Sequence, residues 1–207
     1  MRIILALAAS AALTACTAIG APHEIVSRDS SEWRAAATNH DRARLRDWRE
    51  AFTEGLTKAR AAGHSADIQR EGALLDPDAA IGQVPIPNGD YACRVIKLGA
   101  KSAGLLDYVS YPAFRCRIQQ ERGLQGFAKM TGSQRPVGLI FPGDSLRQVF
   151  LGTLVLGDES RAMQYGRDAE RDVAGYVEKI GANRWRMILP YPAFESTVDV
   201  IELVPAN

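Results

Sequence analysis

The chain has 207 residues, of which 46% are hydrophobic, and its 25 basic side chains nearly balance its 24 acidic ones. Nucleic acids and anionic surfaces attract proteins with an excess of positive charge, so this composition argues against both as partners. The hydrophobic fraction suits one globular domain with an appendage and excludes a chain that is disordered throughout.

Residues 1–15 have the pattern of a bacterial lipoprotein signal peptide. Arg2 provides the basic start, residues 3–13 are almost entirely apolar, and Thr14 and Ala15 lead to Cys16. The apolar segment is shorter than the ~20 residues of a spanning helix and is typical of a cleaved secretory signal. We expect Cys16 to carry the lipid that anchors the protein; an ordinary cleaved signal with a free Cys16 thiol is the alternative. The expected location is the cell envelope, at the outer membrane facing the periplasm.

Residues 16–30 are expected to form the lipid anchor and a tether, and residues 31–88 a helical segment. A helix is predicted from Asp41, as N-cap, to Gly63, because apolar residues recur at three- and four-residue steps between them. Its apolar stripe consists of Leu45, Trp48, Phe52, Leu56 and Ala59. A second, weaker helix is predicted over 65–75. The proline-rich residues 84–89 then mark the boundary to the next segment, because prolines disfavour helix interiors and central strands.

Residues 89–207 are expected to form an antiparallel β domain. Short apolar segments separated by turn residues predict eight strands. They cover residues 90–98, 106–110 continuing into 113–119, 123–131, 136–141, 147–156, 172–180, 184–190 and 197–204. The predicted class is α+β, mainly β: an eight-stranded up-and-down barrel preceded by one or two amphipathic helices, because closure removes exposed edges. A two-layer sandwich is the alternative, and the barrel interior is either filled or hollow.

Two cysteines remain once Cys16 is set aside. Cys93 alternates with Tyr91 and Val95, and Cys116 lies in a second predicted strand, so both thiols are expected on the apolar face. An even number of cysteines in an oxidising compartment predicts a Cys93–Cys116 disulfide. Two buried, unbridged thiols are the alternative.

Ser133, Gln134 and Arg135 form the most polar part of the β region, within residues 129–136. These three side chains are candidate ligand-binding residues at a barrel mouth, where Arg135 would offer a bidentate donor to a polar or anionic group. The alternative is a loop stabilised by hydrogen bonds between its own side chains and the backbone.

No catalytic or metal site is predicted. Residues 143–146 read Gly-Asp-Ser-Leu, like the nucleophile block of some lipases, but no histidine follows His64 to serve Ser145 as a base, so a tight turn is expected. The carboxylates of Glu159 and Glu178 lie too far apart in the sequence to indicate an acid/base pair. The three histidines have no metal-ligand spacing, and no phosphate-binding glycine loop is present, so no cofactor is expected.

Several sequence segments resemble those of an uncharacterised family of bacterial lipoprotein-like proteins, the domain of unknown function 4893. They are Asp41-Arg42 with Leu45 and Trp48, Leu75-Asp76-Pro77, Gly89 with residues 91–99, residues 131–136, Phe150-Leu151-Gly152-Thr153, and residues 184–190. The resemblance implies secretion and a helix-plus-β architecture, and it brings no established activity. More loosely, Gly89-Asp90-Tyr91 is similar to the Gly-x-Trp start of lipocalin-like barrels, with Tyr91 in place of the tryptophan.

Three functional hypotheses follow. The leading one is a non-enzymatic, lipid-anchored barrel that binds a small apolar ligand or an envelope protein. The second is an envelope hydrolase that uses Ser145, Glu178 or the polar loop from Thr131 to Arg135. The third is a structural envelope protein that presents an apolar patch on the helix around Trp48. The protein is expected to contact the membrane only through the lipid on Cys16.

Overall fold

The computed structural model describes residues 22–26, 31–82 and 85–206, so the predicted signal peptide and Cys16 lie outside the described residues. The helices are α1 (Pro22–Ile25), α2 (Trp33–Ala36), α3 (Asn39–Arg46), α4 (Trp48–Ala61), α5 (Ser65–Glu71) and the 3-10 helix η1 (Gly72–Leu75). The strands are β1 (Gly89–Ala100), β2 (Tyr108–Ser110), β3 (Phe114–Glu121), β4 (Leu124–Lys129), β5 (Gln134–Phe141), β6 (Arg147–Leu156), β7 (Asp172–Gly181), β8 (Arg184–Pro190) and β9 (Ser196–Pro205).

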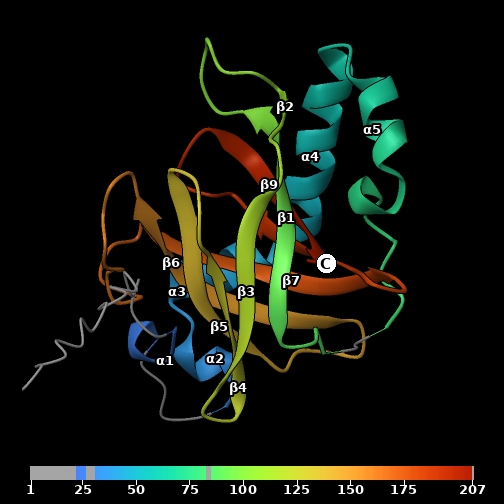
Figure 1. Ribbon diagram of the computed structural model, residues 1–207. Coiled ribbons are helices and arrows are strands. Elements are labelled where there is room, and N and C mark those ends of the chain that lie inside the picture. The colour runs from blue at the N-terminus through green and yellow to red at the C-terminus, as the bar shows by residue number, and fades with distance from the viewer. Residues whose placement is uncertain (1–21, 27–30, 83–84, 207) are drawn as a thin grey trace, which may run out of the picture.

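The nine strands of the described residues form one antiparallel sheet, which closes into a barrel where β1 pairs with β9 (Figure 1). Neighbours in the sheet follow the chain from β3 to β9, and β1 pairs with both β3 and β9. β3 pairs with the first half of β1, where Cys93 lies opposite Phe114, and β2 pairs with its second half, where Ile96 lies opposite Ser110. β2 and β3 therefore act together as one interrupted strand beside β1, so the barrel has eight strand positions. The predicted eight-stranded antiparallel barrel is confirmed, and the sandwich alternative is excluded.

Alternation along the strands fills most of the barrel with apolar side chains. Trp185, Met187 and Leu189 of β8 all belong to this inner core, as their spacing predicts. Strand β9 shows no clear polar face, because both of its faces are buried: Ile201 points into the barrel core, whereas Val200 packs with the helices outside. The inner core contains Ile86, Tyr91, Cys93, Val95, Cys116, Ile118, Phe127, Ile140, Phe150, Leu154, Val173, Val177, Trp185, Met187, Leu189, Ile201 and Leu203.

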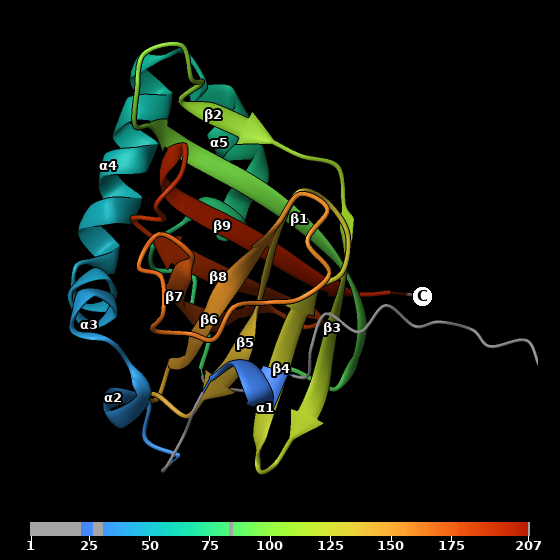
Figure 2. The ribbon, with the colours of Figure 1, turned by 90° about the vertical axis from the view of Figure 1, so that its left-hand side faces the viewer.

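Helices cover part of the barrel's outer surface (Figure 2). The apolar stripe of α4 includes Phe52 and Leu56, which pack with Leu98 of β1 and Val198 of β9. At Gly55 the helix comes so close to the sheet that an added Cβ would lie 2.8 Å from Val198 Cγ1. No helix in the described ranges is long and apolar enough to cross a membrane.

The helical segment begins differently from the prediction. Instead of one helix from Asp41, the structure has α3 and α4, separated at Asp47, and the side chain of Thr38 caps α3 by accepting the Asp41 N–H. The predicted N-cap, Asp41, instead lies in the first turn of α3, and its buried carboxylate accepts hydrogen bonds from Arg44 and from the Tyr165 hydroxyl. Residues 22–26 were expected in the tether. They include the buried side chains of Ile25 and Val26, which belong to a hydrophobic cluster on the outside of the barrel.

Residues 85–88, which precede β1, close one end of the barrel. Ile86 is fully buried in the inner core, and its carbonyl oxygen accepts a hydrogen bond from Gln125 Nε2 at 2.6 Å. The Tyr91 hydroxyl donates to the Pro87 carbonyl oxygen at 2.6 Å. These contacts fix the segment across the end where β1 begins.

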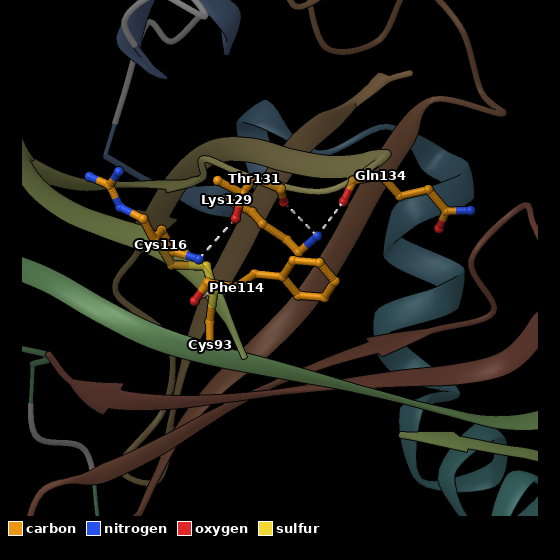
Figure 3. Close-up of a disulfide and its surroundings, with 7 residues drawn as sticks. Cys93, Phe114, Cys116, Lys129, Thr131 and Gln134 are labelled. Carbon is orange, nitrogen blue, oxygen red and sulfur yellow. Dashed lines mark hydrogen bonds between the residues drawn. A yellow bond between two sulfur atoms is a disulfide. The ribbon is translucent and has the colours of Figure 1, made fainter. Parts of the chain in front are cut away.

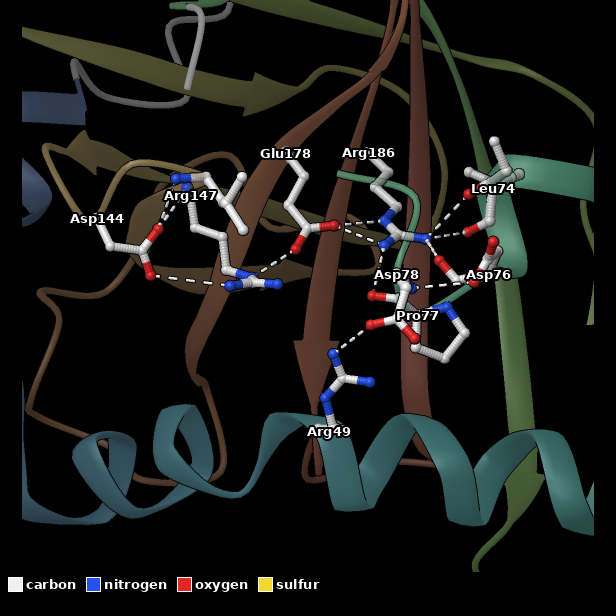
Figure 4. Close-up of polar contacts among 11 residues, drawn as sticks. Arg49, Leu74, Asp76, Pro77, Asp78, Asp144, Arg147, Glu178 and Arg186 are labelled. Atoms are coloured by element: carbon white, nitrogen blue, oxygen red, sulfur yellow. Dashed lines mark hydrogen bonds and ion pairs between the residues drawn. The ribbon is translucent and has the colours of Figure 1, made fainter. Parts of the chain in front are cut away.

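A polar ladder joins the outer surface of the barrel to η1 (Figure 4). Arg147, Glu178 and Arg186 lie side by side on β6, β7 and β8. Glu178 accepts from Arg147 at 2.6 Å and from Arg186 Nε at 2.7 Å. Arg186 also donates to the carbonyl oxygens of Leu74 and Asp76, at 3.0 and 2.7 Å. Although Arg186 lies on the outer face, it is fully buried, because the segment after α5 covers it.

Candidate ligand-binding site

A pocket of about 90 Å³ lies inside the barrel at the end opposite Ile86. Its walls come from the second half of β1, the start of β3, the end of β4 and the strand ends and loops beside them. A cavity of this volume has room for about six to nine water-sized groups. The lining residues are Val95, Lys97, Tyr111, Phe114, Lys129, Ser133, Gln134, Pro136, Leu154, Val173, Leu189, Pro192, Phe194, Glu195, Asp199 and Ile201.

Lys97 is one of two lysines in this pocket, and carboxylates neutralise it. It lies opposite Asp199 in the β1–β9 register, and its Nζ is 2.8 Å from Asp199 Oδ2 and 3.3 Å from Glu195 Oε2. Burial lowers the pKa of Lys97, but the two carboxylates outweigh that effect, so its pKa is raised overall. The Lys97 ammonium also donates to Gln134 Oε1 at 3.1 Å. This lysine is therefore a charged cross-link between strands.

Lys129 is the second lysine, and its surroundings differ. Its buried Nζ donates to the carbonyl oxygens of Thr131 and Gln134, both at 2.9 Å, and lies 3.5 Å from the centroid of the Phe114 ring (Figure 3). No carboxylate of a described residue lies within ion-pair distance of it. Burial, reinforced by the positive charges of Arg135 and Lys97, lowers the pKa of Lys129 to about 8. The pocket thus contains a buried cation that lacks a counter-ion within the described part of the chain.

The disulfide adjoins this lysine. Cys93 and Cys116 are bonded, with their Cα atoms 5.9 Å apart, so the predicted disulfide is confirmed and the free-thiol alternative is excluded. Cys116 lies opposite Lys129 in the β3–β4 register, and Cys93 lies opposite Phe114 in the β1–β3 register. The covalent link therefore ties β1 to β3, the strand that begins with Phe114, whose ring lies beside the Lys129 ammonium of β4.

Two of the three predicted ligand-binding residues line the pocket, and the third does not. Ser133 and Gln134 line the pocket, and Gln134 contacts both lysines, one through its side chain and the other through its backbone. Arg135 is not among the lining residues. Its guanidinium donates to the carbonyl oxygens of Gly132, Gly157 and Glu159, each at 2.7 Å. Arg135 thus ties the loop before β5 to the segment after β6, as in the loop-stabilising alternative.

Two charged residues of the pocket, Lys97 and Asp199, were missed from the sequence, and Lys129 was noted only as part of the polar residues 129–136, although a signal for all three was present. Lys97 continues the alternation of Cys93 and Val95, and Lys129 follows Phe127 by two residues. Asp199 likewise precedes Ile201 by two residues. A charged residue at an inward-facing position near a strand end indicates a polar group inside the barrel. Reading the alternation through to the strand ends would have found all three.

The groups of the hydrolase hypothesis do not meet. Ser145 is exposed in the turn after β5, where Asp144 accepts the backbone N–H groups of Leu146 and Arg147. The loop from Thr131 to Arg135 lies at the opposite end of β5, and Glu178 is buried in the ladder outside the barrel. Glu159 is paired with Arg171 at 2.8 Å. Within residues 22–26, 31–82 and 85–206, no group of three or more His, Cys, Asp or Glu could hold a metal ion.

These features define the class of protein: a closed antiparallel β-barrel with helices on its outer surface. At one end of the barrel lies a pocket with apolar walls and charged side chains. The chain belongs to the family described as "Domain of unknown function (DUF4893)", whose sequence profile matches residues 33–203. The family resemblance seen in the sequence is thereby confirmed. Comparison with curated proteins gives no match, and comparison with solved structures gives none either.

Proposed function

We propose that the protein is a small-ligand-binding barrel, held at the bacterial cell envelope by a lipid on Cys16. The observation that carries the proposal is the Lys129 ammonium, buried at the pocket without a carboxylate partner among the described residues. A buried cation of this kind is best stabilised by an acceptor group that a ligand brings, because desolvation disfavours its charge. The same architecture underlies a lipocalin-like mode of binding, in which a small barrel holds one ligand at its mouth.

The pocket's composition sets the class of ligand. Val95, Leu154, Val173, Leu189 and Ile201 offer apolar walls. Lys129 offers N–H donors near one side, and the two carboxylates are already engaged by Lys97. We therefore expect a ligand with a short apolar body and a negatively charged or carbonyl-bearing head, with about six to nine non-hydrogen atoms inside the pocket.

The Lys129→Met variant tests the binding site. Hexanoate should bind the wild-type protein, and the variant should bind it at least tenfold more weakly, because a charge-assisted hydrogen bond contributes about 1.5–3 kcal/mol. Isothermal titration calorimetry measures both affinities. Lys58→Met is the matched control, since Lys58 pairs with Glu54 and donates to Thr197, none of which lines the pocket, and the affinity should be unchanged. Failure of the wild-type protein to bind hexanoate and its longer homologues, or equal binding by Lys129→Met, would overturn the assignment.

Lipid attachment at Cys16 is a separate part of the proposal. It is supported by the signal-like residues before Cys16 and by the Cys93–Cys116 disulfide, which fits an oxidising compartment. Bacteria grown with an alkyne-bearing fatty acid should incorporate it into the wild-type protein and not into Cys16→Ser. A Cys93→Ser/Cys116→Ser double variant should keep the label, because it retains Cys16. An unlabelled wild-type protein in the culture that labels other lipoproteins would refute lipid attachment.

A further inference from the structure

Lys129 is buried without a carboxylate partner among the described residues, which makes its neutral amine more accessible than that of an ordinary lysine. Its Nζ has two backbone acceptors, the carbonyl oxygens of Thr131 and Gln134. A neutral lysine amine has two N–H donors and one lone pair, so these two acceptors satisfy both donors and leave the lone pair available. Lys97, in the same pocket, instead faces the carboxylates of Asp199 and Glu195, which hold it in the charged form.

We propose that Lys129 is a nucleophile that captures a ligand's aldehyde or ketone group as an imine; this inference rests on the proposed ligand-binding function and names its head group. The Lys129 lone pair attacks the carbonyl carbon and forms a C–N bond, while the carbonyl π bond breaks and its oxygen takes up a proton. The resulting carbinolamine takes up one further proton from solvent and loses its hydroxyl group as water, which leaves an iminium ion. That proton returns to solvent when the iminium ion becomes the neutral imine, so the amine and the carbonyl give imine and water without an oxidant or a reductant.

Two features of the pocket favour this step. Its apolar walls limit the water that would hydrolyse the imine. The face of the Phe114 ring, 3.5 Å from Nζ, stabilises the positive charge of an iminium ion by a cation–π interaction.

The lowered pKa of Lys129 supports the same conclusion. With a pKa of about 8, about a tenth of the Lys129 side chains are neutral at pH 7, roughly 200-fold more than for an ordinary lysine. The charged groups that act on it are Arg135 on β5, Lys97 on β1 and Asp199 on β9, and Glu195 lies in the loop before β9. Lys129 should therefore react faster as pH rises from 6 to about 8 and level off above that range.

Reductive trapping tests the inference. The mature wild-type protein is incubated with hexanal and sodium cyanoborohydride, and the alkylated lysines are located by peptide mapping. The chain has five lysines: Lys58, Lys97, Lys101, Lys129 and Lys179. Lys129 should be alkylated at least tenfold faster than each of the others, and excess hexanoate should slow that reaction. Lys129→Arg keeps the charge but not the nucleophile, so it should lose the rapid labelling.

The outcomes separate the two proposals. Binding of hexanoate without selective alkylation of Lys129 would overturn imine capture and leave ligand binding intact. Absence of both hexanoate binding and selective alkylation would overturn both. Because the peptide map is made on the wild-type protein, it decides the matter even if Lys129→Arg does not fold.

Discussion

Replacement of Arg186 by methionine is expected to lower the free energy of unfolding by about 3–5 kcal/mol, as is usual when one partner of a buried ion pair is removed. Arg186 is fully buried, and so is the Glu178 carboxylate that it contacts at 2.6 Å. The variant would also leave the carbonyl oxygens of Ala73, Leu74 and Asp76 without this donor. Methionine keeps much of the side-chain volume, so the loss would arise from unpaired polar groups and not from a cavity.

The measurement is urea-induced unfolding followed by circular dichroism, with wild-type protein alongside. Arg117→Met provides a matched control, because Arg117 forms an exposed ion pair with Asp90, and such pairs contribute about 0–1 kcal/mol. A loss of less than 1 kcal/mol for Arg186→Met would contradict the view that this residue joins η1 to the barrel. This contact joins two of the sequence segments that resemble the family, because Arg186 donates to the Asp76 carbonyl oxygen. The segments are Leu75-Asp76-Pro77 and Arg184-Trp185-Arg186.

Loss of the Cys93–Cys116 disulfide is expected to destabilise the fold by about 3 kcal/mol, the loop-closure value for a link between residues 23 apart in the sequence. A Cys93→Ala/Cys116→Ala variant removes the link without leaving reactive thiols. Its unfolding midpoint in urea should fall relative to the oxidised wild-type protein. Addition of a thiol reductant should lower the midpoint of the wild-type protein and leave that of the variant unchanged.

The same variant should also bind hexanoate more weakly, because the disulfide fixes β1 to β3 where Phe114 begins β3 beside Lys129. The affinity is measured at low temperature and without urea, where the variant stays folded, so that this effect is separated from unfolding. A variant as stable as the wild-type protein would show that the sheet hydrogen bonds alone hold β1 against β3. An unchanged affinity would show that the pocket does not depend on the link.

Much of the β domain could be predicted because its information is local. Alternation with a period of two assigns Trp185, Met187 and Leu189 to one face, and turn residues separate the strands. The same alternation placed Cys93 and Cys116 on the inner face, where they are bonded. The strand count, the antiparallel order and the disulfide were therefore determined by the sequence itself.

The charged pocket required closure of the barrel. Lys97 and Asp199 are 102 residues apart, and they face each other only because β9 pairs back onto β1. The role of Lys129 likewise depends on burial and on the position of the Phe114 ring, which no spacing in the chain reveals. Arg186 has the alternation of an outward-facing residue, yet the segment after α5 buries it. The periodicity of the sequence determined which residues of each strand face the barrel interior. Only the tertiary structure decided which charged groups are buried and which residues they contact, because both depend on contacts between distant segments.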